Sequence, residues 1–212
     1  MKNTESSKNS IMNFDFLSES LRKYIEKTSS KSPAPGGGSV VALVASLSCS
    51  LLEMVVNFTI GKEKYREYES DFQKIKKRND EIKKEVMRFI EDDSKIYKMI
   101  DENKNNKGKQ QEYLKKSIEI HKKICEYMRE IIEYSNFAAK YGNKYLVSDA
   151  GIVVLLGISA FKGAKLNILI NLKYLSEKGD YVNMMEELNK IEKELEKNGE
   201  KVYCYTLNKI GG

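Results

Sequence analysis

One acidic residue, Asp93, occupies a position in the sequence where the surrounding pattern is apolar. Between residues 62 and 103, apolar residues recur at steps of three or four, as they do along the buried seam of a coiled coil. A carboxylate on such a seam costs roughly several kcal/mol unless a hydrogen bond or a counter-charge satisfies it. Asp93 is therefore either a structural residue that binds a helix end or a lysine, or a general acid or base whose pKa is raised by desolvation. The series comprises Phe72, Ile75, Asn79, Ile82, Val86, Phe89, Asp93, Ile96 and Ile100.

The second candidate is the segment 33–39, which reads Pro-Ala-Pro-Gly-Gly-Gly-Ser and contains both prolines of the chain. Its prolines fix φ, and its glycines let a ligand or another backbone come close. Ser39 stands where the N-cap of the following apolar helix is expected, and a helix N-terminus attracts anions and polar ring edges. The pattern predicts a binding loop, although a tight entry into a buried helix would use the same residues.

Polar residues also share one face of a later predicted helix that is otherwise apolar or small. Ser148 and Asp149 are expected to cap this helix, and Asn167 and Asn171 lie one turn apart within it. Asparagine amides supply both donors and acceptors, and small neighbours would let a flat ligand or another helix approach. Our site hypothesis is a cleft lined by the glycine segment, Asp93, Asp149 and the two asparagines. Tight helix packing with satisfied amides is the alternative.

Histidine and cysteine offer little for metal or redox chemistry. His121 is the only histidine, and it lies on the apolar face of a predicted helix, where a satisfied core residue is more typical than a catalyst. One histidine cannot form a zinc cluster built on several histidines. Cys49, Cys125 and Cys204 lack metal-ligand or redox spacing and are expected to be buried thiols in a reducing cytoplasm. We predict no metal site.

The elements that position these side chains are predicted to be helices. The chain of 212 residues has two prolines and many lysines and glutamates, a composition that favours an all-α fold. We expect a flexible tail over residues 1–12 and a single domain over residues 13–212, folded as a bundle of long antiparallel helices. The expected helices cover residues 14–28, 39–60, 62–103, 110–141, 150–175 and 181–208.

Two expected helices, 39–60 and 150–175, are apolar around nearly their whole circumference. The first is long enough to span a membrane, but Glu53, Asn57 and three serines favour a helix at the centre of a bundle. Two such helices are difficult to bury in one copy, which predicts a homodimer. The net charge of +6 comes from interleaved acidic and basic residues rather than from a basic stripe, so we expect neither nucleic acid nor a membrane as partner.

Several short motifs follow one another in a recognisable order. The segment 33–39 is followed by Glu53-Met54-Val55 and by Gly61-Lys62-x-Lys64-Tyr65. Farther on come Gly142-Asn143, Ser148-Asp149-Ala150-Gly151 and Asn167-Ile168-Leu169-Ile170-Asn171-Leu172. From about residue 14 to its end, the chain resembles the cyclodeaminase/cyclohydrolase family of folate enzymes. Several motifs in the right order are far more specific than one glycine loop.

The resemblance implies an all-α dimer that binds a tetrahydrofolate derivative in a cleft near the subunit interface. It implies chemistry at the one-carbon bridge between N5 and N10, with Asp93, followed by Ser94, as the catalytic carboxylate. It implies no metal and no cofactor beyond the tetrahydrofolate substrate, whose glutamate tail would meet Lys62, Lys64 or Lys165. His121 departs from the family, which often has a proline there. The implied substrate-binding residues are Pro35, Gly36, Gly37, Gly38, Ser39, Lys62, Tyr65, Asp149, Asn167 and Asn171.

Two reactions and one non-enzymatic role remain open at this point. A cyclohydrolase interconverts 5,10-methenyltetrahydrofolate and 10-formyltetrahydrofolate, and a cyclodeaminase closes 5-formiminotetrahydrofolate to the methenyl form with loss of ammonia. We favour the cyclohydrolase, because a stand-alone chain needs no channelled formimino substrate; the cyclodeaminase would work with a separate formiminotransferase. A helical dimer that serves only as a scaffold is the third alternative, and polar residues on buried seams argue against it.

Overall fold

The computed structural model describes residues 15–179 and 181–211, and these residues form helices joined by short turns. The all-α prediction is confirmed for this part of the chain, in which no strand occurs. The tail predicted over residues 1–12 lies outside the described residues. The helices are α2 (Leu21–Ser29), α3 (Gly37–Asn57), the 3-10 helix η1 (Glu63–Tyr68), α4 (Glu69–Glu102), α5 (Lys107–Tyr141), the 3-10 helix η2 (Lys144–Leu146), α6 (Val147–Tyr174) and α7 (Tyr181–Gly211).

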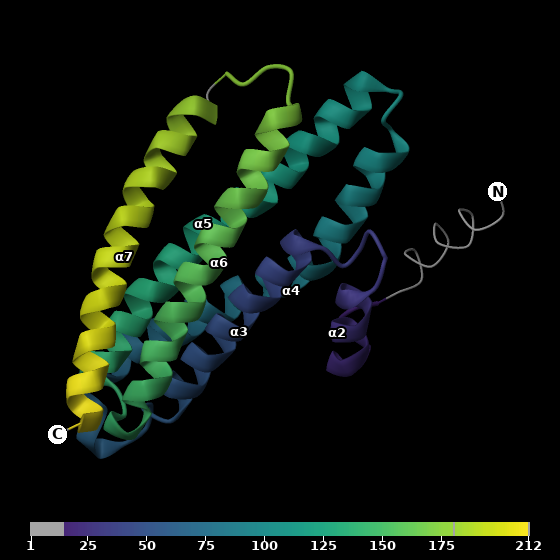
Figure 1. The fold of residues 1–212 in the computed structure, drawn as a ribbon. Helices are drawn as coiled ribbons and strands as arrows, with labels where there is room; N and C mark the ends of the chain where they lie inside the picture. Colours follow the sequence, from purple (N-terminus) through teal and green to yellow (C-terminus); the bar gives the residue numbers. More distant parts are fainter. Residues whose placement is uncertain (1–14, 180, 212) are drawn as a thin grey trace.

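The long helices α4 to α7 run along the bundle, and the shorter α3 packs against α4, α5 and α6 (Figure 1). Helix α3 has 21 residues, whereas α4 has 34 and α5 has 35. At about 1.5 Å per residue, α3 is therefore about 20 Å shorter than α5. Helix α3 begins partway along α4, α5 and α6. The space in front of its N-terminus, between these three helices, stays open.

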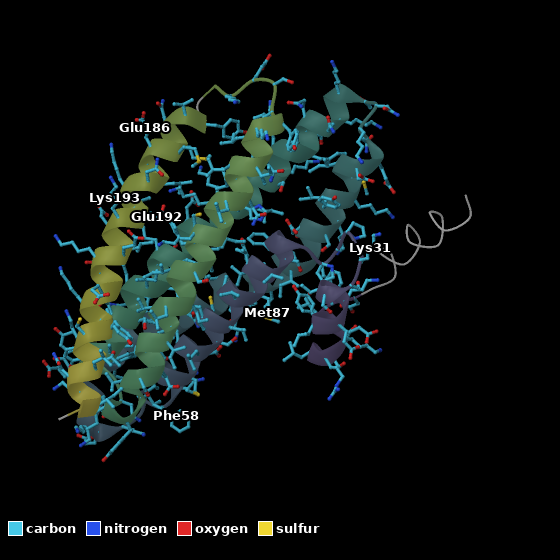
Figure 2. The ribbon with its side chains drawn as sticks, viewed as in Figure 1. Lys31, Phe58, Met87, Glu186, Glu192 and Lys193 are labelled. Carbon is cyan, nitrogen blue, oxygen red and sulfur yellow. The ribbon has the colours of Figure 1, made fainter. Side chains whose placement is uncertain are left out.

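The end of the bundle beyond the C-terminus of α3 is closed by hydrogen bonds between turns. The backbone N–H of Asn143 donates to Thr59 Oγ1 at 3.0 Å, and its side-chain amide donates to the carbonyl of Phe58 at 3.0 Å. The backbone N–H of Lys144 donates to Tyr65 Oη at 3.2 Å. Figure 2 shows Phe58 at this end, where its side chain is exposed. These bonds join the turn after α3 to the turn between α5 and α6.

Helices α3 and α6 satisfy the length and composition of a membrane span, as the core helices of soluble proteins often do. They pack closely, because a Cβ on Gly163 of α6 would lie 2.5 Å from Val41 Cγ2 of α3. Ten of the 21 residues of α3 and eleven of the 28 residues of α6 are buried within the chain. Their outward faces nevertheless remain apolar. Exposed side chains on these faces are Leu47, Ile152, Leu155, Leu166, Leu169 and Ile170.

Helix starts differ from the predicted ones at several places. The first described helix begins at Leu21 rather than at residue 14, and the helix expected from residue 62 opens with η1. Helix α3 begins at Gly37 with extended Gly36 as its N-cap, because Val40 N–H already donates to Gly36 O. The prediction that Ser39 caps this helix is therefore wrong. Ser148 and Asp149 lie inside the first turn of α6, whose N-cap residue makes no side-chain bond.

Candidate active site

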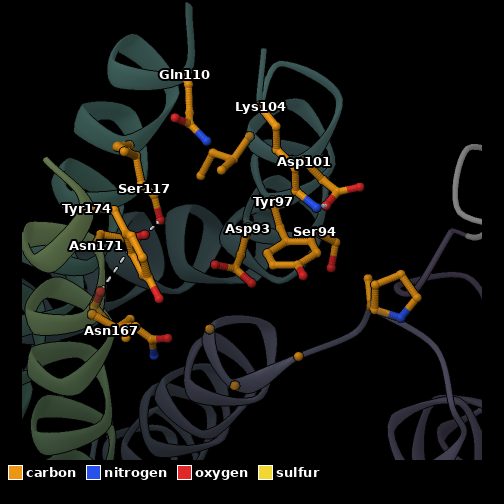
Figure 3. Close-up of a pocket in the computed structure, with 18 residues that line it drawn as sticks. Asp93, Ser94, Tyr97, Asp101, Lys104, Gln110, Ser117, Asn167, Asn171 and Tyr174 are labelled. Atoms are coloured by element: carbon orange, nitrogen blue, oxygen red, sulfur yellow. Dashed lines mark hydrogen bonds and ion pairs between the residues drawn. The ribbon is translucent and has the colours of Figure 1, made fainter. Parts of the chain in front are cut away.

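A pocket of about 510 Å³ occupies the open space at the N-terminus of α3 (Figure 3). Its floor is the glycine segment, and its walls come from α4, α5 and α6. Polar side chains and backbone alternate with a few apolar ones, as in sites that orient a small organic ligand. The lining residues are Pro33, Ala34, Gly36, Gly37, Gly38, Asp93, Ser94, Tyr97, Ile100, Asp101, Lys104, Gln110, Leu114, Ser117, Asn167, Ile170, Asn171 and Tyr174.

Asp93 lies directly against Gly38 at the base of the pocket. A Cβ on Gly38 would come within 2.1 Å of Asp93 Oδ1 and 2.4 Å of its Cγ, so a larger residue at this position would require the carboxyl group of Asp93 to move. The backbone N–H of Ser39 donates a hydrogen bond to the carboxyl group. Burial raises the pKa of Asp93 above its usual range; a positive charge on His121, were that ring protonated on both nitrogens, would oppose this shift, as does the backbone bond from Ser39. The seam position predicted from the sequence thus places a carboxyl group of raised pKa in the pocket.

His121 contacts Asp93 from α5 and is almost completely buried. Its Nδ1 lies 2.8 Å from the carbonyl oxygen of Ser117, and its Nε2 lies 3.6 Å from Asp93 Oδ1. Within the described residues, Nε2 has no hydrogen-bond partner. His121 is therefore a core residue, as expected from the sequence, but in this part of the chain only its Nδ1 has a hydrogen-bond partner. The expectation that both ring nitrogens are satisfied is wrong for Nε2.

The side chain of Ser39 points away from the pocket and contacts α2 and α4. Its Oγ donates to the carbonyl oxygen of Ile90 at 2.7 Å and lies 3.0 Å from Tyr24 Oη. These bonds join the first turn of α3 to α4 and α2. Pro35 is also buried behind the pocket surface, between Ala34 and Gly36, which do line it.

Asn167 and Asn171 line the opposite wall, as predicted, with their amide nitrogens already engaged. Asn171 Nδ2 donates to Ser117 Oγ and to the carbonyl oxygen of Asn167, both at 2.9 Å, as Figure 3 shows. Asn167 Nδ2 donates to the carbonyl oxygen of Gly163 at 3.0 Å. Held in this way, the two side chains present fixed amide oxygens, which suit N–H donors on the edge of a ligand.

The structure places three predicted binding residues at the other end of the bundle. Lys62 precedes η1, Tyr65 accepts its bond from Lys144, and Asp149 is in the first turn of α6. The 21 residues of α3 separate this end from the pocket by about 30 Å. A single copy of the chain therefore does not bring Lys62, Tyr65 and Asp149 together with Asp93.

The two other lysines considered for an anionic tail are also outside the pocket lining. Lys64 lies over the ring of Tyr65, and Lys165 is paired with Glu192 of α7. Lys104, which no sequence pattern singled out, lies at the pocket mouth in an ion pair with Asp101. It is the cation in the lining of this pocket.

Helical spacing explains several lining residues that were not selected from the sequence. Tyr97 and Asp101 lie four and eight residues after Asp93, and so share its face of α4. Ser117 lies one turn before His121. This spacing was available in the sequence, whereas the contact of these residues with α6 was not.

No group of three or more His, Cys, Asp and Glu side chains that could hold a metal ion occurs in residues 15–179 and 181–211. The pocket offers instead the carboxyl group of Asp93 and amide oxygens, with the imidazole of His121 buried behind Asp93. This set suits proton transfer to or from a polar heterocycle.

Both the sequence and the fold of this chain are similar to those of known proteins. The sequence profile described as formiminotransferase-cyclodeaminase matches residues 20–190, which is most of the chain. The chain belongs to this family.

A methenyltetrahydrofolate cyclohydrolase from Methylorubrum extorquens is 29% identical over 203 residues, which cover 91% of this chain and 98% of that protein. The rat formimidoyltransferase-cyclodeaminase is 24% identical over 172 residues, and the chain spans only 32% of its length. The structure of a formiminotetrahydrofolate cyclodeaminase from Thermotoga maritima superimposes with a TM-score of 0.86 at 27% identity, covering 92% of this chain and all of that one.

Proposed function

We propose that this protein is a folate-dependent one-carbon enzyme, a 5,10-methenyltetrahydrofolate cyclohydrolase. The observation that carries this assignment is the relative of that name, which matches over nearly its full length. The pocket adds a carboxyl group of raised pKa, held by Gly38 and Ser39, where a cyclic substrate would lie. A scaffold would not need a buried carboxyl group in an open pocket, so the enzymatic assignment is the stronger one.

The proposed reaction needs one proton acceptor that later acts as a donor. The oxygen of a water molecule forms a bond to the bridge carbon between N5 and N10, and Asp93 accepts a proton from that water. The bond from the bridge carbon to N5 then breaks, N5 takes the proton from Asp93, and the hydroxyl proton leaves to solvent. The products are 10-formyltetrahydrofolate and one released proton. A carboxyl group of raised pKa suits both steps.

The cyclodeaminase reaction is the second candidate, because the structural relative from Thermotoga maritima bears that name. In that reaction N10 forms a bond to the formimino carbon and its proton passes to the formimino nitrogen, and the bond between that carbon and that nitrogen breaks, so that ammonia leaves. Asp93 would then protonate the departing nitrogen. The same pocket serves both reactions, so the substrate supplied decides between them.

Absorbance of the methenyl chromophore tests the assignment directly. We expect the purified protein to remove the chromophore of 5,10-methenyltetrahydrofolate at a rate well above that of buffer alone. Appearance of the chromophore from 5-formiminotetrahydrofolate, with no loss of added methenyltetrahydrofolate, would replace the cyclohydrolase by the cyclodeaminase. A protein that changes neither substrate would leave the scaffold as the remaining role.

The unpaired cysteines support a reducing cytoplasm as the location of the protein; Cys49 and Cys125 are buried as expected, whereas Cys204 is exposed. The apolar outward faces of α3 and α6 support a homodimer. Leu166, which is 66% exposed in one copy, lies on this face. We expect the wild-type chain of 24.4 kDa to have twice that mass in light scattering after gel filtration, and Leu166→Glu to shift it towards the monomer. Leu207→Glu on α7, also at an exposed leucine, is the control and should stay dimeric. A monomeric wild type would contradict the proposal.

A further inference from the structure

The hydrogen bond between His121 and Ser117 determines which ring nitrogen carries a proton. Nδ1 lies 2.8 Å from the carbonyl oxygen of Ser117, which can only accept a hydrogen bond. Nδ1 must therefore be the N–H donor. In a neutral imidazole the other nitrogen, Nε2, then has a lone pair and no proton.

That lone pair faces the carboxyl group of Asp93. Nε2 is buried, lies 3.6 Å from Asp93 Oδ1 and has no other partner within the described residues. Two acceptors that face each other in a buried site repel unless a proton lies between them. A small rotation of the Asp93 side chain would bring Oδ1 into hydrogen-bond distance, as often happens when a ligand enters an active site.

We propose that Asp93 and His121 hold one proton between them, carried on Oδ1 of Asp93 and donated to Nε2 of His121. The protonation state itself is independent of the proposed function. Only its effect on the reaction rate rests on that function. His121 is then a positioning residue, which acts on the substrate through Asp93. The neighbouring groups agree with this protonation state: burial raises the pKa of Asp93 and lowers that of His121, and both effects favour the uncharged forms.

Within the part of the chain that the structure describes, none of the other ionisable groups around Asp93 and His121 supplies a proton or a charge that would take the place of the shared proton. From α2, Tyr24 approaches Asp93, and burial raises the pKa of its phenol, so it stays neutral. From α4 comes the phenol of Tyr97, and from α4 and the turn after it come Asp101 and Lys104, which pair with each other at the pocket mouth. Helix α3 contributes the backbone N–H of Ser39, and α6 contributes Asn167, Asn171 and the phenol of Tyr174.

The shared proton has a defined effect on the pH dependence of the reaction. Asp93 accepts a proton from water only after the pair has lost its own, so kcat/KM for hydrolysis should rise with pH. A neutral histidine that accepts from the acid form stabilises that form and moves the rise to higher pH. Replacing His121 by a side chain that cannot share a proton should therefore move the rise to lower pH.

Nuclear magnetic resonance of nitrogen-15-labelled full-length protein tests the protonation state without any activity, because His121 is the only histidine. At neutral pH we expect a proton bonded to Nδ1 and none bonded to Nε2, with the Nε2 signal displaced by the hydrogen bond. As the pH is raised, this signal should change at the pH where kcat/KM rises, and Asp93→Asn should abolish that step. A proton on Nε2, or the same titration in Asp93→Asn, would overturn the proposal.

The variants His121→Gln and His121→Leu provide the kinetic test, with melting temperatures measured to confirm that each folds. The rate of Asp93→Asn at each pH is subtracted first, because it measures the activity that does not depend on the carboxyl group. In both His121 variants the remaining kcat/KM should then rise at a lower pH than in the wild type. An unchanged pH at a reduced rate would show a purely structural histidine, and a move to higher pH would show an imidazolium; both results overturn the proposal. If the protein lacks activity but carries the proton as described, the proposed function fails and this inference stands.

Discussion

Asp93→Asn is expected to lower kcat for the loss of methenyltetrahydrofolate by about 10²–10⁴-fold, the range typical of a lost general acid or base. Asparagine keeps the size and shape of the side chain but cannot accept a proton from water. The fold should be retained, because a buried carboxyl group is replaced by a neutral amide. Absorbance of the methenyl chromophore gives the rate, and circular dichroism during heating checks the fold.

Asp92→Asn is the matched control, since Asp92 is the adjacent residue on α4 and makes a solvent-facing ion pair with Arg88 at 3.3 Å. An exposed pair of this kind contributes little to stability. The control should keep nearly all of the wild-type rate. Equal losses in both variants, or an Asp93→Asn enzyme with more than a tenth of the wild-type rate, would remove Asp93 from its proposed role.

Gly38→Ala is expected to lower kcat/KM by about 10²-fold, because a displacement of about 1 Å in a reacting group has effects of this size. The new Cβ would lie 2.1 Å from Asp93 Oδ1, so the carboxyl group would have to leave its position at the base of the pocket. The same contact should lower the midpoint of thermal unfolding. Steady-state kinetics and calorimetry measure the two effects.

Gly37→Ala provides the comparison within the same turn. A Cβ there would lie 3.9 Å from Asn167 Oδ1, which is ordinary van der Waals contact, and alanine favours the helix. We expect this variant to keep its stability and to lose much less activity than Gly38→Ala. If the two variants behave alike, the contact between Gly38 and Asp93 does not determine the geometry of the site.

Much of this arrangement follows from local patterns in the sequence. The three-to-four spacing along α4 placed Asp93 on the buried side, and Gly36, Gly37 and Gly38 of the segment 33–39 line the floor of the pocket. Asn167 and Asn171 were found for the same reason, since one helical turn separates them and puts both on one face. Periodicity reports the direction of a side chain within its own helix, and these predictions needed only that.

Predictions that depended on the relative position of helices were less successful. Lys62, Tyr65 and Asp149 belong to motifs that resemble those of the family, yet in one copy they lie about 30 Å from Asp93 because α3 separates them from the pocket. Their role in binding stays a prediction. The partner of His121 was not predictable either, since the meeting of α4 and α5 at Asp93 depends on the packing of the whole bundle.

The main-chain floor of the pocket has a consequence for the evolution of specificity. At Gly36, Gly37 and Gly38 the floor is backbone with no side chains to vary, and at Gly38 a methyl group would displace the carboxyl group of Asp93. Differences in selectivity between relatives that share this floor must therefore arise from the side-chain walls contributed by α4, α5 and α6. An effort to redirect the enzyme towards another one-carbon substituent can leave the glycine segment unchanged and confine its library to positions such as Tyr97, Ser117 and Tyr174.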